Sequence, residues 1–376
     1  MNKVIGYSGP LYMFITPEEM YGELGKLKSS HINYKEADIY FLTKMKKVKF
    51  DKSYSDVTSD ASIKIKVLLF DKNGKREIKN GKVQIIDFFY SLPHIRKSFK
   101  SSNEFIFYVL YNLYAPKKSF WRKSLNILKK LFINNLISEN FLFTLMKFIY
   151  SKEVKIEFLS DYTIGIDEPI ATILTDEKSL KLQKELFPEK HEEIIKLNEK
   201  PFDKDALKNV DHSRLGKLNS KSLVLSIDQV VNILDIDVGE QEILYIGQTK
   251  REPFERLLPH EKLQELTSTF LRNDSEAIVV HLFGFQIISN LMSYNKLTSD
   301  DKLTTLEAEL IHYFKPEMND KFKNGNRNTW KHIKNIKKCG LQEIFIELDI
   351  DGQYCKFLTE AIKKDNPNQH IIRIKL

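Results

Sequence analysis

The sequence predicts an α+β protein, because segments with the period of a strand and segments with the period of a helix both occur along it. Between residues 38 and 90 the alternation of Ile63–Val67 and the turn signal of Asp71–Lys75 indicate β-strands. From Phe88 to Tyr150 the apolar residues have helical spacing, which Pro93 and Pro116 interrupt. The first part of the chain is therefore expected to be mixed.

A polar, weakly periodic stretch over residues 201–221 separates this part from a second series of elements. We expect strands at 230–236, 242–246 and 277–285 and helices at about 253–266 and 301–314. A strand at 343–348, a helix at 357–363 and a strand at 370–376 follow. The predicted domains are residues 1–220, a compact β-β-α-β-α core over 221–330, and its extension over 331–376.

The chain of 376 residues has a net charge of +8, unevenly distributed. Residues 221–376 carry 21 Lys and Arg against 23 Asp and Glu, whereas residues 1–220 carry 38 against 28. If a polyanion binds, its electrostatic anchor is expected in the first 220 residues.

Only two cysteines, Cys339 and Cys355, occur in the chain. Two thiols argue against a disulfide framework and against a zinc site, which needs about four protein ligands. Residues 1–16 make a poor signal peptide, and no uncharged stretch approaches the roughly 20 apolar residues of a membrane span. We therefore expect a cytoplasmic protein with no membrane partner.

Glu307 is the most informative carboxylate. On a helix it shares its face with Leu303, Leu310, Ile311 and Phe314, whereas Glu309 points roughly the opposite way. A carboxylate on an apolar face is costly unless a cation or hydrogen-bond donors meet it. A divalent metal would be such a partner. The alternative is a capping box, in which Thr304 caps the helix and Glu307 bonds back to the backbone.

Two further segments carry candidate polar groups. Tyr245 ends an apolar strand, and Gly247 after it permits a close backbone approach. A phenol there could position or deprotonate water, although most strand tyrosines are packing residues. Arg256 and His260 would share one face of a continuous helix, but Pro259 between them would kink or end it.

Residues 230–319 resemble the GIY-YIG nuclease domain, a small α/β module of excision-repair nucleases, homing endonucleases and some restriction enzymes. The second half of the name motif is Tyr245–Gly247, and the family's arginine helix, often R-L-x-x-H, matches Arg256–His260. The family's metal-binding glutamate, in an E-x-x-L-I context, falls on Glu307. Its K/R-P-x-x-N ending falls on Lys315–Asn319. The matching segments cover about a quarter of the chain.

The resemblance implies an antiparallel sheet flanked by helices and a metal-dependent endonuclease that uses one Mg²⁺ or Mn²⁺ bound by Glu307. Arg256 would offset phosphoryl charge, Tyr245 would orient or deprotonate water with help from Lys250 or His260, and Asn319 would brace the site or contact the nucleic-acid backbone. The expected partner is nucleic acid, DNA in preference to RNA.

One departure concerns the family's first motif, Gly-Ile-Tyr, which should lie about ten residues before Tyr245. Residues 230–235 read VVNILD and contain no tyrosine. This absence leaves Tyr245 without a tyrosine partner. It also motivates the alternative function, a non-catalytic nucleic-acid-binding or assembly protein on a degenerate fold of this family.

The first 220 residues also hold a basic segment with interleaved aromatics, at residues 96–130. Such a segment suits phosphate neutralisation and base stacking, and the N-terminal region would then select the target. The alternative is that the aromatics are helical core and the cations a solvated face. The candidate nucleic-acid-binding residues are Arg96, Lys97, Lys100, Lys117, Lys118, Arg122 and Lys123.

Overall fold

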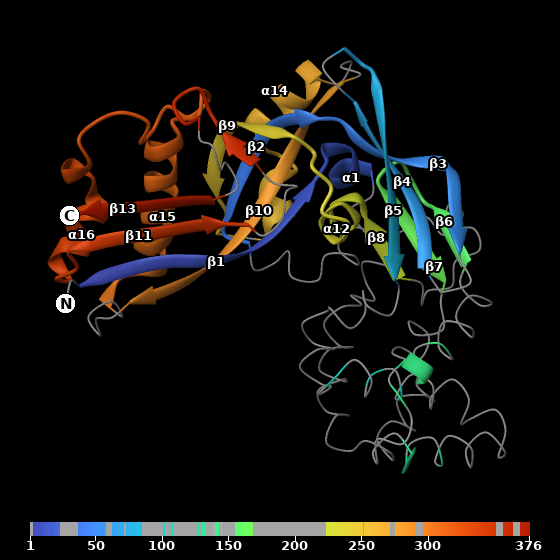
Figure 1. Cartoon of the computed structure of the whole chain (residues 1–376). Coiled ribbons are helices and arrows are strands. Elements are labelled where there is room, and N and C mark those ends of the chain that lie inside the picture. The colour runs from blue at the N-terminus through green and yellow to red at the C-terminus, as the bar shows by residue number, and fades with distance from the viewer. Residues whose placement is uncertain are drawn as a thin grey trace.

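The computed structural model describes residues 3–22, 37–57, 62–70, 73–84, 155–167, 223–250, 252–270, 275–289, 296–350, 356–363 and 369–376, with isolated positions between 101 and 144. Within them the fold is α+β, as predicted: a curled seven-stranded sheet carries helices, and two three-stranded sheets accompany it (Figure 1).

The seven-stranded sheet draws its strands from both ends of the chain. Its order is β12-β9-β2-β10-β1-β11-β13, and the pairs are antiparallel except β1–β11 and β12–β9, which are parallel. The sheet is therefore mixed, whereas the resemblance to the nuclease family implied an antiparallel one. The strands are β1 (Val4–Ile15), β2 (Ile39–Lys46), β9 (Glu240–Gln248), β10 (Glu276–Ser289), β11 (Glu343–Asp349), β12 (Lys356–Leu358) and β13 (Gln369–Lys375).

Both faces of this sheet are covered by helices. Side chains of successive strand residues point to opposite faces. In β2, Ile39 and Phe41 belong to one apolar cluster and Tyr40 and Leu42 to the other. The first cluster includes side chains of α12 (Ile227–Ile233), α15 (Ser299–Phe314) and α16 (Lys331–Lys338). The second includes α1 (Pro17–Gly22), α13 (Pro253–Leu257) and α14 (Glu261–Phe270).

Strands β2 and β9 are adjacent antiparallel neighbours although residues 47–239 lie between them in sequence. Lys44 pairs with Glu242 in register, and their side chains form an ion pair of 2.6 Å. The expected division at residue 220 is therefore not a boundary of this sheet, since β1 and β2 come from before it. The chain leaves the sheet at the end of β2 and returns to it at β9.

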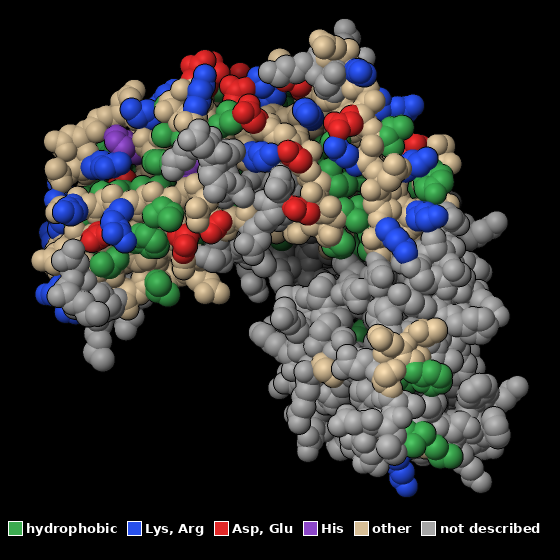
Figure 2. All heavy atoms as spheres, in the orientation of Figure 1, with side chains coloured by type: hydrophobic (Ala, Val, Ile, Leu, Met, Phe, Trp, Pro, Cys, Tyr) green, Lys and Arg blue, Asp and Glu red, His purple; other side chains and the backbone are tan. Residues whose placement is uncertain are grey.

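Two antiparallel three-stranded sheets lie within that intervening chain. Figure 2 shows Lys and Arg side chains over the first of them, where Lys64, Arg76 and Lys82 are exposed. The second is joined to α12 because Ser226 ends its last strand and begins the helix. The first sheet comprises β3 (Val48–Val57), β4 (Ser62–Phe70) and β5 (Arg76–Gln84); the second comprises β6 (Lys155–Phe158), β7 (Thr163–Asp167) and β8 (Leu223–Ser226).

At two places the predicted type of secondary structure, strand or helix, is wrong. Residues 230–236 were expected as a strand, but they lie in and after α12, whose start carries a capping box of Ser226 and Gln229. Residues 357–363 were expected as a helix, but Phe357 is buried at the centre of β12. Both runs are short and apolar, and periodicity alone does not separate strand from helix in such runs.

Candidate active site

The candidate site begins with a tyrosine from each of two neighbouring strands. Tyr40 of β2 lies opposite Gly247 of β9, and Leu42 lies opposite Tyr245. The two tyrosine rings lie on the same face with their centroids 6.1 Å apart. A Cβ atom added at Gly247 would lie 2.5 Å from Cζ of Tyr40 and 2.9 Å from Cε1 of Tyr245. Glycine at this position is therefore what allows the Tyr40 ring to lie across the strand toward Tyr245.

The expectation that Tyr245 has no tyrosine partner is wrong. Tyr40 is fully buried and donates a hydrogen bond to the Tyr245 oxygen, which favours the ionised form of Tyr245. Desolvation by burial is the larger influence and raises the pKa of both phenols. Tyr245 is thus a neutral phenol at pH 7 that receives a hydrogen bond from Tyr40. The sequence signal was the triplet Asp38–Tyr40 at the start of β2.

His260 holds Tyr40 from the other side. Its Nε2 lies 2.8 Å from the Tyr40 hydroxyl, and its Nδ1 accepts a hydrogen bond from the backbone N–H of Leu263 at 3.3 Å. Because Nδ1 is an acceptor, the proton is assigned to Nε2, which donates to Tyr40. Burial lowers the pKa of His260 to about 4, so the ring is neutral at pH 7. The result is a directed chain from His260 through Tyr40 to Tyr245.

Pro259 divides the predicted helix over 253–266 into α13 and α14, so Arg256 and His260 do not share one continuous helix. His260 instead precedes α14 and caps it through its Nδ1. Arg256 is exposed on α13, and its charge lowers the pKa of Tyr40, Tyr245 and Glu307. The guanidinium therefore lies within electrostatic reach of all three groups.

Glu307 lies in the interior of α15, not in its first turn. The helix is capped by Thr298, whose side chain accepts from the N–H of Asp301, so Thr304 is not a capping residue and the capping-box alternative is excluded. The Glu307 carboxylate accepts a hydrogen bond from the backbone N–H of Gln248 at the end of β9. Burial nevertheless raises the pKa of Glu307 to about 7. The charged form thus lacks full compensation from the protein, which is the state expected of a carboxylate that meets a cation.

Glu309, two residues further along α15, has a different partner. Its side chain is fully buried, and its Oε2 lies 3.1 Å from Nε of Arg327 in the short 3₁₀ helix Arg327–Thr329. Burial raises the pKa of Glu309 to about 7 as well. The helix thus carries two buried carboxylates with different surroundings. Glu309 is paired with an arginine, whereas the negative charge of Glu307 raises the pKa of Tyr40 and Tyr245.

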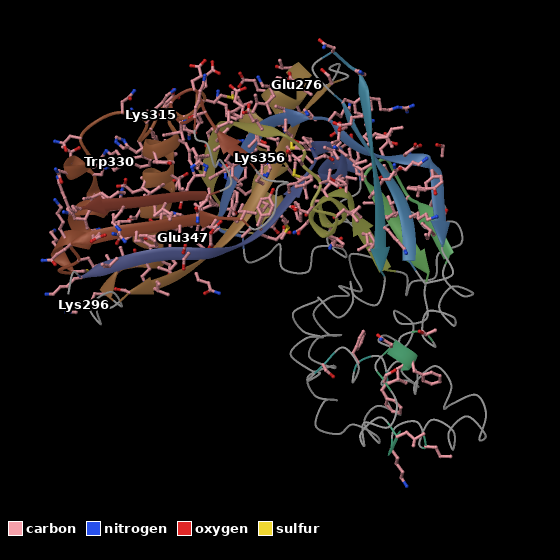
Figure 3. The ribbon with its side chains drawn as sticks, viewed as in Figure 1. Glu276, Lys296, Lys315, Trp330, Glu347 and Lys356 are labelled. Carbon is pink, nitrogen blue, oxygen red and sulfur yellow. The ribbon has the colours of Figure 1, made fainter. Side chains whose placement is uncertain are left out.

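Asn319 fastens the strand that carries Tyr245. Its Oδ1 accepts from the N–H of Ile246 at 2.9 Å, and its Nδ2 donates to the carbonyl of the same residue at 2.8 Å. The chain reaches this position because Lys315, labelled in Figure 3, ends α15 in the left-handed conformation, with φ 52°. Asn319 is buried, so of the two predicted roles the bracing role is the one that its contacts support.

Lys250, the other predicted helper of Tyr245, follows β9 and forms an ion pair with Asp300 in the first turn of α15. Both side chains are more than half exposed. Its charge lowers the pKa of Glu307, so Lys250 lies within electrostatic reach of that carboxylate. The structure therefore brings together Tyr245, Arg256, His260, Lys250 and Glu307, with Asn319 behind them, and adds Tyr40.

The predicted nucleic-acid-binding residues between Arg96 and Lys123 lie outside the described residues. In the part of the chain that the structure describes, no group of three or more His, Cys, Asp or Glu side chains could hold a metal ion. Within the same part no helix is long and apolar enough to cross a membrane. No protein-family model, curated protein or solved structure matches this chain.

Substituting Gly247 by Ala is expected to lower the free energy of unfolding by about 1–3 kcal/mol, the usual cost of overpacking. The added methyl would meet the ring of Tyr40, which is fully buried. Urea unfolding measures the change. Gly22→Ala is the matched control, because a Cβ there meets nothing within 4 Å. Equal stability of the two variants would contradict the packing described.

Proposed function

We propose that the protein is a metal-dependent endonuclease of the GIY-YIG type, hydrolysing phosphodiester bonds in nucleic acid, DNA in preference to RNA. The observation that carries the proposal is the contact between Tyr40 and Tyr245. Asp38–Tyr40 then corresponds to the family's first motif and Tyr245–Gly247 to its second, on adjacent strands. The correspondence departs from the family at Asp38, where the motif has glycine.

Glu307 supports the metal part of the proposal. Magnesium is usually bound through one or two carboxylates, with water and substrate phosphate supplying its other ligands. A lone carboxylate whose pKa burial raises to about 7 gains most when a cation arrives, so the residues present fit such an ion. A bound Mg²⁺ or Mn²⁺ would polarise the scissile phosphate and stabilise the leaving oxygen.

The protein's own groups have separable roles in this proposal. Tyr245, a neutral phenol, orients the attacking water through its oxygen, and the hydrogen bond from Tyr40 fixes that oxygen. His260 stays neutral and holds Tyr40. Arg256 offsets charge that develops on the phosphoryl oxygens. Asn319 is a positioning residue because its contacts are to the backbone of Ile246.

Two further parts of the proposal concern recognition. Lys250 is exposed beside the site and suits a flanking phosphate. Target selection is assigned to the chain between β2 and β9, which carries the basic three-stranded sheet. The alternative of a non-catalytic binding protein loses its motivation, which was the absence of a second tyrosine.

The direct test is incubation of the purified protein with unmodified, modified, single-stranded and branched DNA, with Mg²⁺ or Mn²⁺ and with EDTA. We expect metal-dependent cuts in at least one substrate and none with EDTA. Parallel RNA substrates test the preference for DNA. Binding of every substrate without a cut in any would favour the non-catalytic alternative.

Metal affinity should depend on pH through Glu307. Because burial raises the pKa of Glu307 to about 7, protons compete with the metal in the neutral range. Affinity for Mn²⁺ should therefore fall about tenfold for each pH unit below 7. Calorimetric titration at pH 5.5 and 7.5 measures the ratio, with Glu307→Gln as the control that removes binding. An affinity independent of pH would contradict the assignment.

The same group predicts the sign of a stability change without metal. The folded protein holds the Glu307 proton more tightly than the unfolded chain, whose glutamate has its ordinary pKa of 4.5. The contribution of this group to stability is therefore present below pH 4.5 and lost as the pH rises to about 7. Thermal melting in EDTA across this range should show a steeper decline for the natural protein than for Glu307→Gln.

A further inference from the structure

A cleft opens between the start of β2, the end of β9 and the first turn of α15. Its volume is about 600 Å³, within the range of small-molecule sites. Ala37 and Leu303 supply apolar walls. Leu303 precedes Glu307 by four residues, which is about 6 Å along the helix axis. The cleft therefore lies about one helical turn from the carboxylate proposed to bind the metal.

Three carboxylates line this cleft, and two of them have partners in the protein. Asp300 pairs with Lys250, and Glu252 accepts from the N–H of Glu255 at the start of α13. Asp38 differs. Among the described residues, its carboxylate has no hydrogen-bond or ion-pair partner, and burial raises its pKa with no charged neighbour contributing to the shift.

The backbone holds Asp38 rigidly at this position. Its N–H donates to the carbonyl of Phe283 at 2.8 Å, and its carbonyl accepts from the N–H of Thr249 at 2.8 Å. These bonds tie it to β10 on one side and to the end of β9 on the other. A backbone fixed in this way, two residues before Tyr40, presents the carboxylate of Asp38 to the cleft from a set position.

We propose that the cleft is a nucleobase subsite in which Asp38 accepts a hydrogen bond from the exocyclic amino group of cytosine or adenine, in a nucleotide next to the scissile bond. Aspartate is a recognised acceptor for the amino group of cytosine. The apolar walls suit the faces of a base, whereas three carboxylates set against the charge of Lys250 disfavour a phosphate inside the cleft. The proposal rests on the proposed function for the position of the phosphate.

The test has a cleavage arm and a binding arm that share one DNA pool with randomised positions. In the first arm the natural protein and Asp38→Asn cut the pool with Mn²⁺, and the ends are sequenced. In the second arm Glu307→Gln, with and without Asp38→Asn, selects bound DNA at fixed salt. Asp349→Asn, which changes an exposed carboxylate at the end of β11, is the matched control.

We expect about tenfold enrichment of cytosine or adenine at one position beside the cut, because one good base contact discriminates by this order. Asp38→Asn carries a donor beside its acceptor and should therefore also admit thymine or guanine at that position, which lowers the enrichment, whereas Asp349→Asn should leave the enrichment unchanged. A change in the DNA tests the same contact without any protein variant. Uracil in place of cytosine, or hypoxanthine in place of adenine, at that position should lower cleavage by the natural protein about tenfold.

The outcomes separate the two proposals. If the protein cuts DNA but Asp38→Asn has the same base preference, or if uracil and hypoxanthine are tolerated, the proposed subsite is overturned and the proposed nuclease activity stands. Base preference in the binding arm that depends on Asp38, without any cutting, overturns the nuclease and supports the subsite. No preference in either arm overturns the subsite.

Discussion

Replacing Glu307 by Gln is expected to lower the cleavage rate at least about a thousandfold, the upper range for removal of one electrostatic catalytic group. Glutamine keeps the size of the side chain but loses the charge that would hold the metal. Single-turnover cleavage at saturating Mg²⁺ measures the effect, and circular dichroism with thermal melting checks the fold.

Glu309→Gln is the matched control. Glu309 lies on the same helix, is also buried, and has a pKa that burial also raises to about 7, but its partner is Arg327. This variant should cost about 1–3 kcal/mol of stability, because it leaves a charged group without its partner. Cleavage should remain within about threefold of the natural rate, the scatter expected of a site outside the chemistry. Equal loss of cleavage in both variants would contradict the assignment of Glu307.

Replacing Tyr40 by Phe is expected to lower the cleavage rate about a hundredfold, with little change in KM, as for other groups that act through proton positioning. The ring still fills the space over Gly247, so the fold should persist. The lost hydroxyl breaks the chain from His260 to Tyr245. Steady-state kinetics on the preferred substrate separates the effect on kcat from that on KM.

Tyr7→Phe is the control for removing a buried phenol. Tyr7 is fully buried in the other apolar cluster, and its hydroxyl donates to the carbonyl of Lys302 at 2.8 Å. This change should cost about 1 kcal/mol of stability, as for a typical hydrogen bond, with an unchanged cleavage rate. A Tyr40→Phe variant no slower than Tyr7→Phe would remove Tyr40 from the mechanism.

The residues that sequence reasoning found are those whose roles follow from nearby positions. Tyr245 and Gly247 are two positions apart on one strand, and Glu307 was recognised from the apolar residues of its own helix. Tyr40 was missed because 205 positions, from 40 to 245, separate it from Tyr245. The entropic cost of closing a loop grows only slowly with its length, so an insertion of this size between two paired strands is physically tolerable. A search for motifs at a fixed local spacing does not detect strands that are paired across such an insertion.

The roles of polar residues were harder to predict than their presence. Asn319 was placed near the site, but that both ends of its amide bond the backbone of Ile246 depends on the turn after α15. Pro259 was expected to kink or end the helix between Arg256 and His260, and it does, but that His260 caps the next helix was not predicted. The position of Asp38 at a cleft depends on β2 lying between β9 and β10, which no local pattern indicates.

The measurement that tests the central claim most directly is a double-mutant cycle of Tyr40→Phe, Tyr245→Phe and the two combined, by single-turnover cleavage. If the two phenols act as one unit, the combined variant should cut within about threefold of the slower single variant, because groups that act together are strongly non-additive. Losses that multiply in the combined variant, or a natural rate in Tyr40→Phe, would contradict a site built jointly from β2 and β9.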